Sequence, residues 1–242
     1  MGKKYKEWKE SFEMKKKYSK NHPYCFYELA EKYLPEDKEA IIVDVGCGDC
    51  SFEDHIKLWD RYKKIILLDG NEDTIAKLRI NHKEFNTYEY IAPDQFPFTM
   101  DRSIDYIYCS HLIEHLNPND LYDLLYEFDR VLKPGGVLVI ISPMLSVDFY
   151  NTLDHIKPYF PLIFEIYLCG LESGNPSYAL ISKDYKVEKL VYRYHNYLSD
   201  SNRLGSSNKV VDFLIQGIGR ISRKLGIRRY RQTGYTMILR KE

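Results

Sequence analysis

A short apolar run that ends in a glycine-rich turn constrains the fold of this chain more than any other feature. Ile41–Val45 is rich in β-branched residues, which favour a buried strand, and Gly46-Cys47-Gly48 follows at once. Because glycine has no Cβ, it can adopt positive φ and leave backbone N–H groups open to a ligand. A buried strand followed by such a loop is typical of a nucleotide-like cofactor site.

Strand-like and helix-like segments alternate along the chain. Helical patterns fill 51–60, 73–80 and 121–132, and two further helices are expected within residues 3–34, with a break at Asn21-His22-Pro23. The segments that we expect to be strands are Ile41–Val45, 64–68, 88–92, 104–109, 137–142, 186–194 and 235–240. The alternation predicts an α/β fold, with a Rossmann-like, seven-stranded, mostly parallel sheet and helices on both of its faces. A helical insert, 195–233, separates the last two strands.

The length of 242 residues and a hydrophobic content of 44% suit one globular domain over residues 1–242. Within it we expect an N-terminal helical cap (1–38), a cofactor-binding core (39–145) and a substrate-side region (146–242). The formal net charge is zero, which argues against a dedicated nucleic-acid binder with a basic surface. We therefore expect no nucleic-acid partner, and the sequence indicates no particular oligomeric state.

The cysteines and the lack of targeting patterns indicate a compartment. The five cysteines form no disulfide framework. Cys47 and Cys50 are best interpreted as small residues of the glycine loop, because no thioredoxin-like pattern or second cysteine pair accompanies them. Neither a signal peptide nor a membrane-spanning run is visible. We therefore expect a cytoplasmic protein.

The residues that follow each strand form the candidate site, because ligands of an open parallel sheet bind beyond the carboxyl ends of its strands. Asp69 follows the second strand, where an acid can accept hydrogen bonds from ribose hydroxyls. Asp94 follows the third strand and can accept from an adenine amino group, and Phe96 can stack on the ring. The candidate cofactor-binding residues are Asp44, Gly46, Cys47, Gly48, Asp69, Gly70, Asn71, Asp94, Gln95, Phe96, Cys109, Ser110 and His111.

Five ordered segments of this chain resemble the motifs of class I S-adenosylmethionine-dependent methyltransferases. They are Val43-Asp44-Val45-Gly46-Cys47-Gly48, Leu67-Leu68-Asp69-Gly70, Asp94-Gln95-Phe96-Pro97-Phe98, 104–116 and 130–138. The resemblance implies that S-adenosylmethionine is the cofactor. It also implies that the glycine loop faces the methionine part of the cofactor and that Asp69 holds the ribose.

The same resemblance implies roles for two later segments. Asp94 and Gln95 would frame the adenine, and Cys109 and Ser110 would border the sulfonium. One residue departs from the family pattern, because Cys50 stands where the family often has a further glycine. Its side chain should point away from the cofactor or narrow the loop.

Two other motif interpretations fit less well. A dinucleotide loop reads G-x-G-x-x-G/A, whereas Ser51 takes the third small position here and Asp49 would place negative charge beside a pyrophosphate. Residues 111–115 match the H-x-x-E-H pattern of zinc proteases, but they directly follow an expected strand and a third ligand is not evident. We therefore expect no metal at the site.

His155 and His111 are the candidate catalytic residues. His155 follows the fifth strand within Asp154-His155-Ile156, where an imidazole can remove a proton from a hydroxyl as the methyl group arrives. The alternative is a surface histidine beside a helix-capping Asp154. His111 either lines the pocket or packs structurally. Because methyl transfer is an in-line displacement, alignment of donor and acceptor supplies much of the rate, and a base is not obligatory.

The segments outside the cofactor core should select the substrate. The insert helix carries apolar residues on one face and basic residues at its end and beyond: Val211, Leu214, Ile218, Ile221 and Leu225, then Arg220, Arg223, Lys224, Arg228, Arg229 and Arg231. Such a helix either packs on the sheet or makes peripheral contact with an anionic membrane surface, here the inner face of the membrane. Aromatic residues of 144–180 either form a substrate wall or pack in the core.

These observations predict a methyltransferase that methylates oxygen on a small-molecule, sugar or lipid-linked acceptor. Two alternatives remain. One is an N-methyltransferase that acts on protein or RNA, although the segment after the fourth strand lacks an Asn-Pro-Pro-Tyr-like motif. The other is a cofactor-binding subunit without catalytic activity.

Overall fold

The computed structural model describes residues 3–19, 24–98, 101–146, 148–173, 177–196, 207–224 and 230–242. The chain divides into two compact units, of which one comprises residues 1–25 with 192–233 and the other 26–191 with 234–242. The second unit holds most of the sheet and all of the candidate site. The division into cap, core and substrate-side region stays a prediction.

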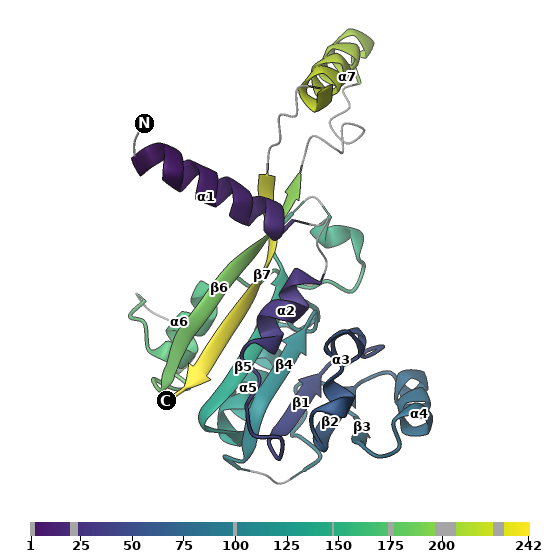
Figure 1. Cartoon of the computed structure of the whole chain (residues 1–242), viewed down its shortest axis with the longest axis vertical. Helices are drawn as coiled ribbons and strands as arrows, with labels where there is room; N and C mark the ends of the chain where they lie inside the picture. Colours follow the sequence, from purple (N-terminus) through teal and green to yellow (C-terminus); the bar gives the residue numbers. More distant parts are fainter. Residues whose placement is uncertain are drawn as a thin grey trace. The chain divides into compact units, whose positions relative to one another are not determined.

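The described residues form a seven-stranded sheet with the order β3-β2-β1-β4-β5-β7-β6 (Figure 1). Its strands are β1 (Ile41–Val45), β2 (Lys64–Asp69), β3 (Asn86–Glu89), β4 (Ile104–Ser110), β5 (Leu132–Pro143), β6 (Tyr185–Asn196) and β7 (Tyr230–Lys241). The pairings from β3 to β5 are parallel, and β7 runs antiparallel to β5. The predicted mostly parallel, Rossmann-like sheet is confirmed. The strand order reverses between β1 and β4, which is where ligands of such sheets bind.

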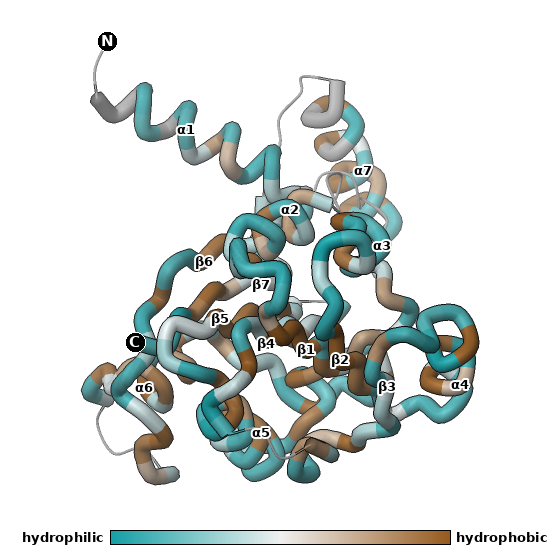
Figure 2. Tube along the Cα trace, turned by 60° about the horizontal axis from the view of Figure 1, so that its bottom comes forward, coloured by the Kyte–Doolittle hydropathy of each residue, from teal (hydrophilic) through white to brown (hydrophobic). Residues whose placement is uncertain are grey.

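Helices cover both faces of this sheet. The helices are α1 (Lys3–Lys17), α2 (Cys25–Glu31), α3 (Ser51–Ile56), α4 (Glu72–Asn81), α5 (Pro118–Val131), α6 (Leu162–Cys169) and α7 (Lys209–Lys224). Ile42 and Tyr106 share one buried cluster with Phe52 of α3, whereas Val43 and Ile107 alternate to the opposite face. Leucines of α5 are buried there against β5. Figure 2 shows the corresponding hydrophobic colouring along β1, β4 and β5.

Several element boundaries differ from the sequence-based expectation; β7, for example, begins at Tyr230 rather than at residue 235. The third strand spans Asn86–Glu89 rather than residues 88–92, because the chain turns soon after it, with Asp94 N–H donating to Ile91 O at 2.9 Å. The predicted helix 51–60 ends at Ile56, because Lys57 adopts a left-handed conformation (φ 53°), and a short 3₁₀ helix follows over Leu58–Asp60. β5 begins at Leu132 and so includes the predicted turn 133–136.

The insert between β6 and β7 contains α7, as predicted. Its apolar residues Phe213, Leu214 and Ile218 are exposed. Leu225, Arg228 and Arg229 lie outside the described residues, as does the predicted helix break at Asn21-His22-Pro23. Among the helices that the structure describes, none has the length and apolarity needed to span a bilayer.

Candidate active site

The glycine loop after β1 is tied to the end of β2. Gly46 and Cys47 donate their N–H groups to Leu68 O at 2.8 and 3.0 Å. Both glycines adopt positive φ, 79° for Gly46 and 52° for Gly48. A Cβ at Gly46 would lie 3.4 Å from Leu112 Cβ, whereas one at Gly48 would meet no atom within 4 Å. Gly48 therefore leaves open space over the loop, which is where a ligand can approach the backbone.

Cys50 also adopts a left-handed conformation, with φ 58°. Its side chain is 1% exposed and belongs to the buried core cluster. The residue that replaces the expected glycine therefore points into the protein interior and keeps the loop clear. A residue other than glycine is strained at this φ, so the backbone at Cys50 is strained beside the site.

Asp69 links the glycine loop to the start of α4. Its Oδ2 accepts from Gly48 N–H at 2.8 Å, and its Oδ1 accepts from Asn71 N–H at 2.9 Å. Asn71 in turn caps α4, because its Oδ1 accepts from Thr74 N–H at 2.9 Å. A carboxylate offers about four lone-pair positions, so two positions on Asp69 remain for ribose hydroxyls. Gly70 allows the chain to pass closely, since a Cβ there would lie 3.3 Å from Tyr90 O.

A pocket of about 170 Å³ opens beside this loop. It is lined by Tyr27, Asp44, Gly46, Cys47, Gly48, Asp49, Ser51, Phe52, Glu53, Tyr108 and Ser110. The volume is below the range of about 300–1,000 Å³ that is usual for whole ligands, so the pocket suits one part of a cofactor. Of the residues predicted to bind the cofactor, the structure thus gathers Asp44, the glycine loop and Ser110 around one space.

Two buried carboxyl groups form the wall of this pocket. Asp44 is 3% exposed and Glu53 is fully buried. Within the described part of the chain, Asp44 Oδ1 and both Oε atoms of Glu53 lack a partner other than each other's carboxyl group. Burial raises the pKa of Asp44 well above its ordinary value, and the negative charge of Glu53 is the second cause of this shift. Burial also raises the pKa of Glu53.

This carboxyl pair fits a cationic ligand. Buried charges are costly unless an opposite charge compensates them, and orphaned carboxyl oxygens accept hydrogen bonds from an ammonium group. The methionine part of S-adenosylmethionine carries both an ammonium and a sulfonium. The residues present therefore fit the cofactor that the motifs imply.

The residues predicted to surround the adenine lie apart from the described pocket. Phe96 is 4% exposed, and its N–H donates to Glu127 Oε1 at 2.8 Å. Its ring centroid lies 5.2 Å from that of Tyr90. Asp94 and Gln95 are exposed on the turn after β3. Phe96 thus packs in the core, and the adenine contacts of all three residues stay predictions.

The end of β4 carries a strained histidine beside a buried acid. Cys109 is buried, and His111 adopts positive φ (56°) while its N–H donates to Ile141 O of β5 at 2.9 Å. His111 Nδ1 lies 3.1 Å from Glu114 Oε1, and Ser142 Oγ donates to Glu114 Oε2 at 3.3 Å. Glu114 is completely buried and the His111 side chain is 47% exposed. Strain of this kind in a non-glycine residue is often found at functional sites.

His155 joins this segment from the loop after β5. Its Nδ1 lies 2.7 Å from Phe149 O, and its ring meets that of His115 edge to face, with centroids 5.0 Å apart. His115 Nδ1 lies 3.1 Å from Asp154 O. The structure thus places the two predicted catalytic histidines in one cluster. It also adds Glu114 and His115, which only the H-x-x-E-H spacing singles out in the sequence.

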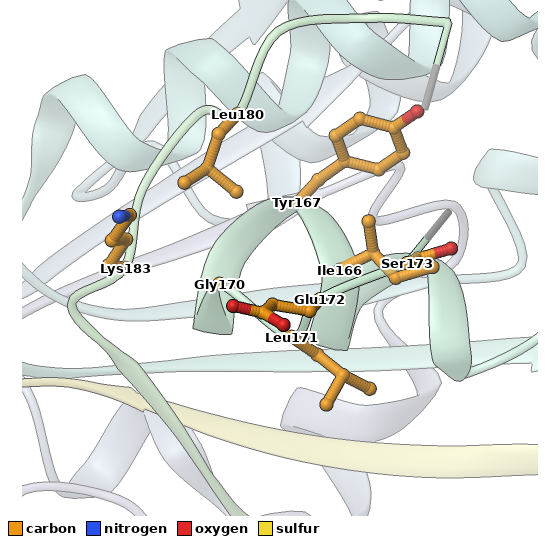
Figure 3. A pocket seen from close by; sticks show the side chains of 8 residues that line it. All are labelled: Ile166, Tyr167, Gly170, Leu171, Glu172, Ser173, Leu180 and Lys183. Carbon is orange, nitrogen blue, oxygen red and sulfur yellow. The ribbon is translucent and has the colours of Figure 1, made fainter. Parts of the chain in front are cut away.

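The aromatic residues of 144–180 do not form one wall. Tyr159 and Phe164 are buried, whereas Tyr150 and Phe160 are exposed. A further pocket, of about 580 Å³, lies around the end of α6 (Figure 3). It is lined by Ile166, Tyr167, Gly170, Leu171, Glu172, Ser173, Leu180 and Lys183. It contains no residue of the glycine loop or of the histidine cluster, so its position does not suit methyl transfer.

Comparisons with known proteins find similarity to methyltransferases. Residues 43–140 match a family model described as a methyltransferase domain. The chain is 25% identical over 129 residues to a small RNA 2'-O-methyltransferase of Xenopus tropicalis, covering 48% of this chain and 34% of that protein. It is 29% identical over 127 residues to malonyl-acyl-carrier-protein O-methyltransferase 1 of Coxiella burnetii, covering 50% and 42%. The chain thus spans less than half the length of these relatives.

A solved structure supports the fold over nearly the whole chain. An S-adenosylmethionine-dependent methyltransferase from Archaeoglobus fulgidus superposes with a TM-score of 0.54 and 24% identity, covering 89% of this chain and 92% of its own. The family match includes the glycine loop, Asp69 and the end of β4. Residues 43–140 therefore match a methyltransferase domain, and the chain has the fold of this S-adenosylmethionine-dependent methyltransferase.

Proposed function

We propose that this protein transfers the methyl group of S-adenosylmethionine to an oxygen of a small-molecule, sugar or lipid-linked acceptor. The observation that carries the proposal is the cluster of His111, His115 and His155 at the carboxyl ends of β4 and β5. This cluster is continuous in sequence with Ser110, which lines the loop pocket. Imidazoles beside the methyl donor suit an acceptor that carries a hydroxyl proton.

The protein's task in this reaction is alignment and proton handling. The cofactor supplies an activated methyl group on a sulfonium. The glycine loop, Asp69 and the buried carboxyls of Asp44 and Glu53 would fix the donor. Since His155 Nδ1 lies 2.7 Å from a backbone carbonyl oxygen, it carries the proton, and the Nε2 lone pair can accept a hydrogen bond from the acceptor hydroxyl.

The relatives support oxygen as the acceptor atom. The Xenopus tropicalis and Coxiella burnetii proteins are both O-methyltransferases by name. The residues after β4 are Ser110-His111-Leu112-Ile113 and lack the Asn-Pro-Pro-Tyr-like motif of amide-directed enzymes. The first of these relatives makes an RNA hydroxyl the second candidate acceptor. The zero net charge of this chain argues against an RNA acceptor.

A membrane contact through α7 is the second part of the proposal. Val210, Phe213, Leu214, Ile218 and Ile221 are exposed, which is unusual for one short helix. The sequence from Arg220 onward is rich in arginine and lysine. An apolar face combined with basic residues suits the surface of a bilayer that contains anionic lipids. The protein would then meet a lipid-linked acceptor where that acceptor resides.

The test is methyl transfer from methyl-labelled cofactor to fractions of a cell extract, with mass spectrometry of the labelled product. Organic-extractable or small polar products whose methyl group maps to oxygen support the proposal. Label that nuclease treatment releases, or methyl groups that map to nitrogen, would select the RNA or N-methyl alternatives. Cofactor binding by calorimetry without turnover on any fraction would select the inactive subunit.

A further inference from the structure

The side chains of Glu114, His115 and His155 converge on one small space. Glu114 and His115 belong to the 3₁₀ turn Ile113–His115 after β4, and His155 lies on the loop after β5. One oxygen of Glu114 and one nitrogen of each imidazole lie within 4.8 Å of one another. Ligands around an ion at 2.0–2.2 Å are roughly 3–3.5 Å apart, so small rotations of the partly exposed imidazoles close the site.

Each imidazole is oriented as metal-binding histidines usually are. His155 Nδ1 lies 2.7 Å from Phe149 O, and His115 Nδ1 lies 3.1 Å from Asp154 O and 3.2 Å from Asp154 Oδ2. Because these oxygens only accept, both Nδ1 atoms carry protons and both Nε2 atoms keep their lone pairs. A second-shell carbonyl or carboxylate on the far nitrogen is the usual partner of a metal-bound histidine.

The carboxylate is held in the same way. Glu114 is completely buried, with Oε1 at 3.1 Å from His111 Nδ1 and Oε2 accepting from Ser142 Oγ at 3.3 Å. The backbone also fixes the loop to this turn, because Ile156 N–H donates to Glu114 O at 2.8 Å. A buried carboxylate needs a cation or full hydrogen bonding to offset its desolvation. A bound cation beside His115 and His155 would meet that need.

We propose that Glu114, His115 and His155 bind one divalent transition-metal ion, such as Zn²⁺, Mn²⁺ or Co²⁺, which holds the acceptor hydroxyl for methyl transfer. Two imidazoles and one carboxylate favour these ions over Mg²⁺ or Ca²⁺ and leave coordination positions open. With the ion bound, His155 is a metal ligand and no longer a base. This proposal replaces the sequence-based expectation that the site holds no metal. The ion's role in transfer rests on the proposed function, but its binding does not.

The ion would act on the acceptor as a Lewis acid. It lowers the pKa of the hydroxyl, whose proton leaves to water. The acceptor oxygen then forms a bond to the methyl carbon while the carbon–sulfur bond breaks and its electron pair stays on sulfur. Leu112 lies two residues before Glu114, and a Cβ added to Gly46 would lie 3.4 Å from Leu112 Cβ. The turn that carries the ligands is therefore packed on the cofactor loop.

The experiment measures metal binding without reference to activity. The full chain, stripped with a chelator, is titrated with Co²⁺ and followed by calorimetry and visible absorption. We expect one ion per chain, with affinity reduced at least tenfold in His115→Ala and His155→Ala. His82→Ala is the matched control, because His82 stacks on Trp59 instead, and should bind like the wild type. Thermal melts confirm that each variant is folded.

The outcomes separate this proposal from the proposed function. Absence of stoichiometric binding by the wild type, or equal affinity in the wild type and both ligand variants, overturns the metal site. Methyl transfer that persists after chelation overturns the ion's role in transfer and leaves the proposed function standing. Methyl transfer that stops on chelation and returns with Mn²⁺ or Co²⁺ supports that role.

Discussion

Asp69→Asn should weaken cofactor binding by removing charge from the acceptor of the ribose hydroxyls. Asp69 uses one position on each oxygen for Gly48 N–H and Asn71 N–H, which leaves two for the ribose. Asparagine keeps one oxygen and turns the other acceptor into a donor. Hydrogen bonds to charged groups contribute about 1.5–3 kcal/mol each, so the dissociation constant should rise on the order of 10- to 100-fold.

The substitution also disturbs the loop, and the assay must separate the two effects. We would measure the affinity for S-adenosylhomocysteine and for an analogue that lacks the ribose hydroxyls, both by calorimetry. The wild type should discriminate strongly between the two ligands, and Asp69→Asn should lose most of that difference. Asp73→Asn makes the same charge change at an exposed position of α4 and should bind normally. An Asp69→Asn penalty that is equal for both ligands would refute the ribose contact.

Buried and exposed groups outside the ribose contact can be tested in the same way. Burial raises the pKa of Glu53, so the folded state holds an unfavourable charge as pH rises above the ordinary carboxyl range. Glu53→Gln should therefore raise the free energy of unfolding in urea more at pH 8 than at pH 5, and it should weaken cofactor binding. A stabilised variant with normal cofactor affinity would contradict the cation site. Tyr106→Phe removes the buried hydroxyl that donates to Ala30 O at 2.8 Å and should cost about 1–3 kcal/mol of unfolding free energy, whereas an unchanged urea midpoint would show that the bond is not needed. Phe213→Ser with Ile218→Ser should lower co-sedimentation with anionic vesicles on the order of tenfold or more, and a wild type that stays in the supernatant would end the membrane proposal.

The sequence predicts the sheet well because its signals are local. Each buried strand is a short apolar run, and each is followed by a turn or helix pattern that does not depend on distant residues. The ends of the elements and the burial of loop residues are less predictable. β3 ends at Glu89 because a turn follows it, in which Asp94 N–H donates to Ile91 O at 2.9 Å. The Phe96 ring is buried against Tyr90 and against Phe128 of α5, which lies about 30 residues further along the chain.

The candidate site is less predictable than the fold because its groups come from separate segments. Glu53 lies on a helix that looks charged and solvent-exposed in the sequence, yet it is fully buried beside Asp44. His155 meets His115 only because the loop after β5 folds back on the turn after β4. Spacing along the chain carries no information on such closures. The H-x-x-E-H pattern names two members of the cluster but not the third.

Buried carboxyl groups link the two proposed ligands of this domain. Asp44 and Glu53 at the loop, and Glu114 after β4, are buried carboxyl groups, and a bound cation would offset the desolvation of each. Ligands that bind only the folded state stabilise it in proportion to the logarithm of their concentration over their dissociation constant. The cofactor should therefore raise the melting temperature through its contact with Asp44 and Glu53. A divalent ion should raise it through its contact with Glu114. Because Leu112 packs on Gly46 between them, the turn that holds the ion also closes one side of the cofactor loop, so the two stabilisations need not be independent.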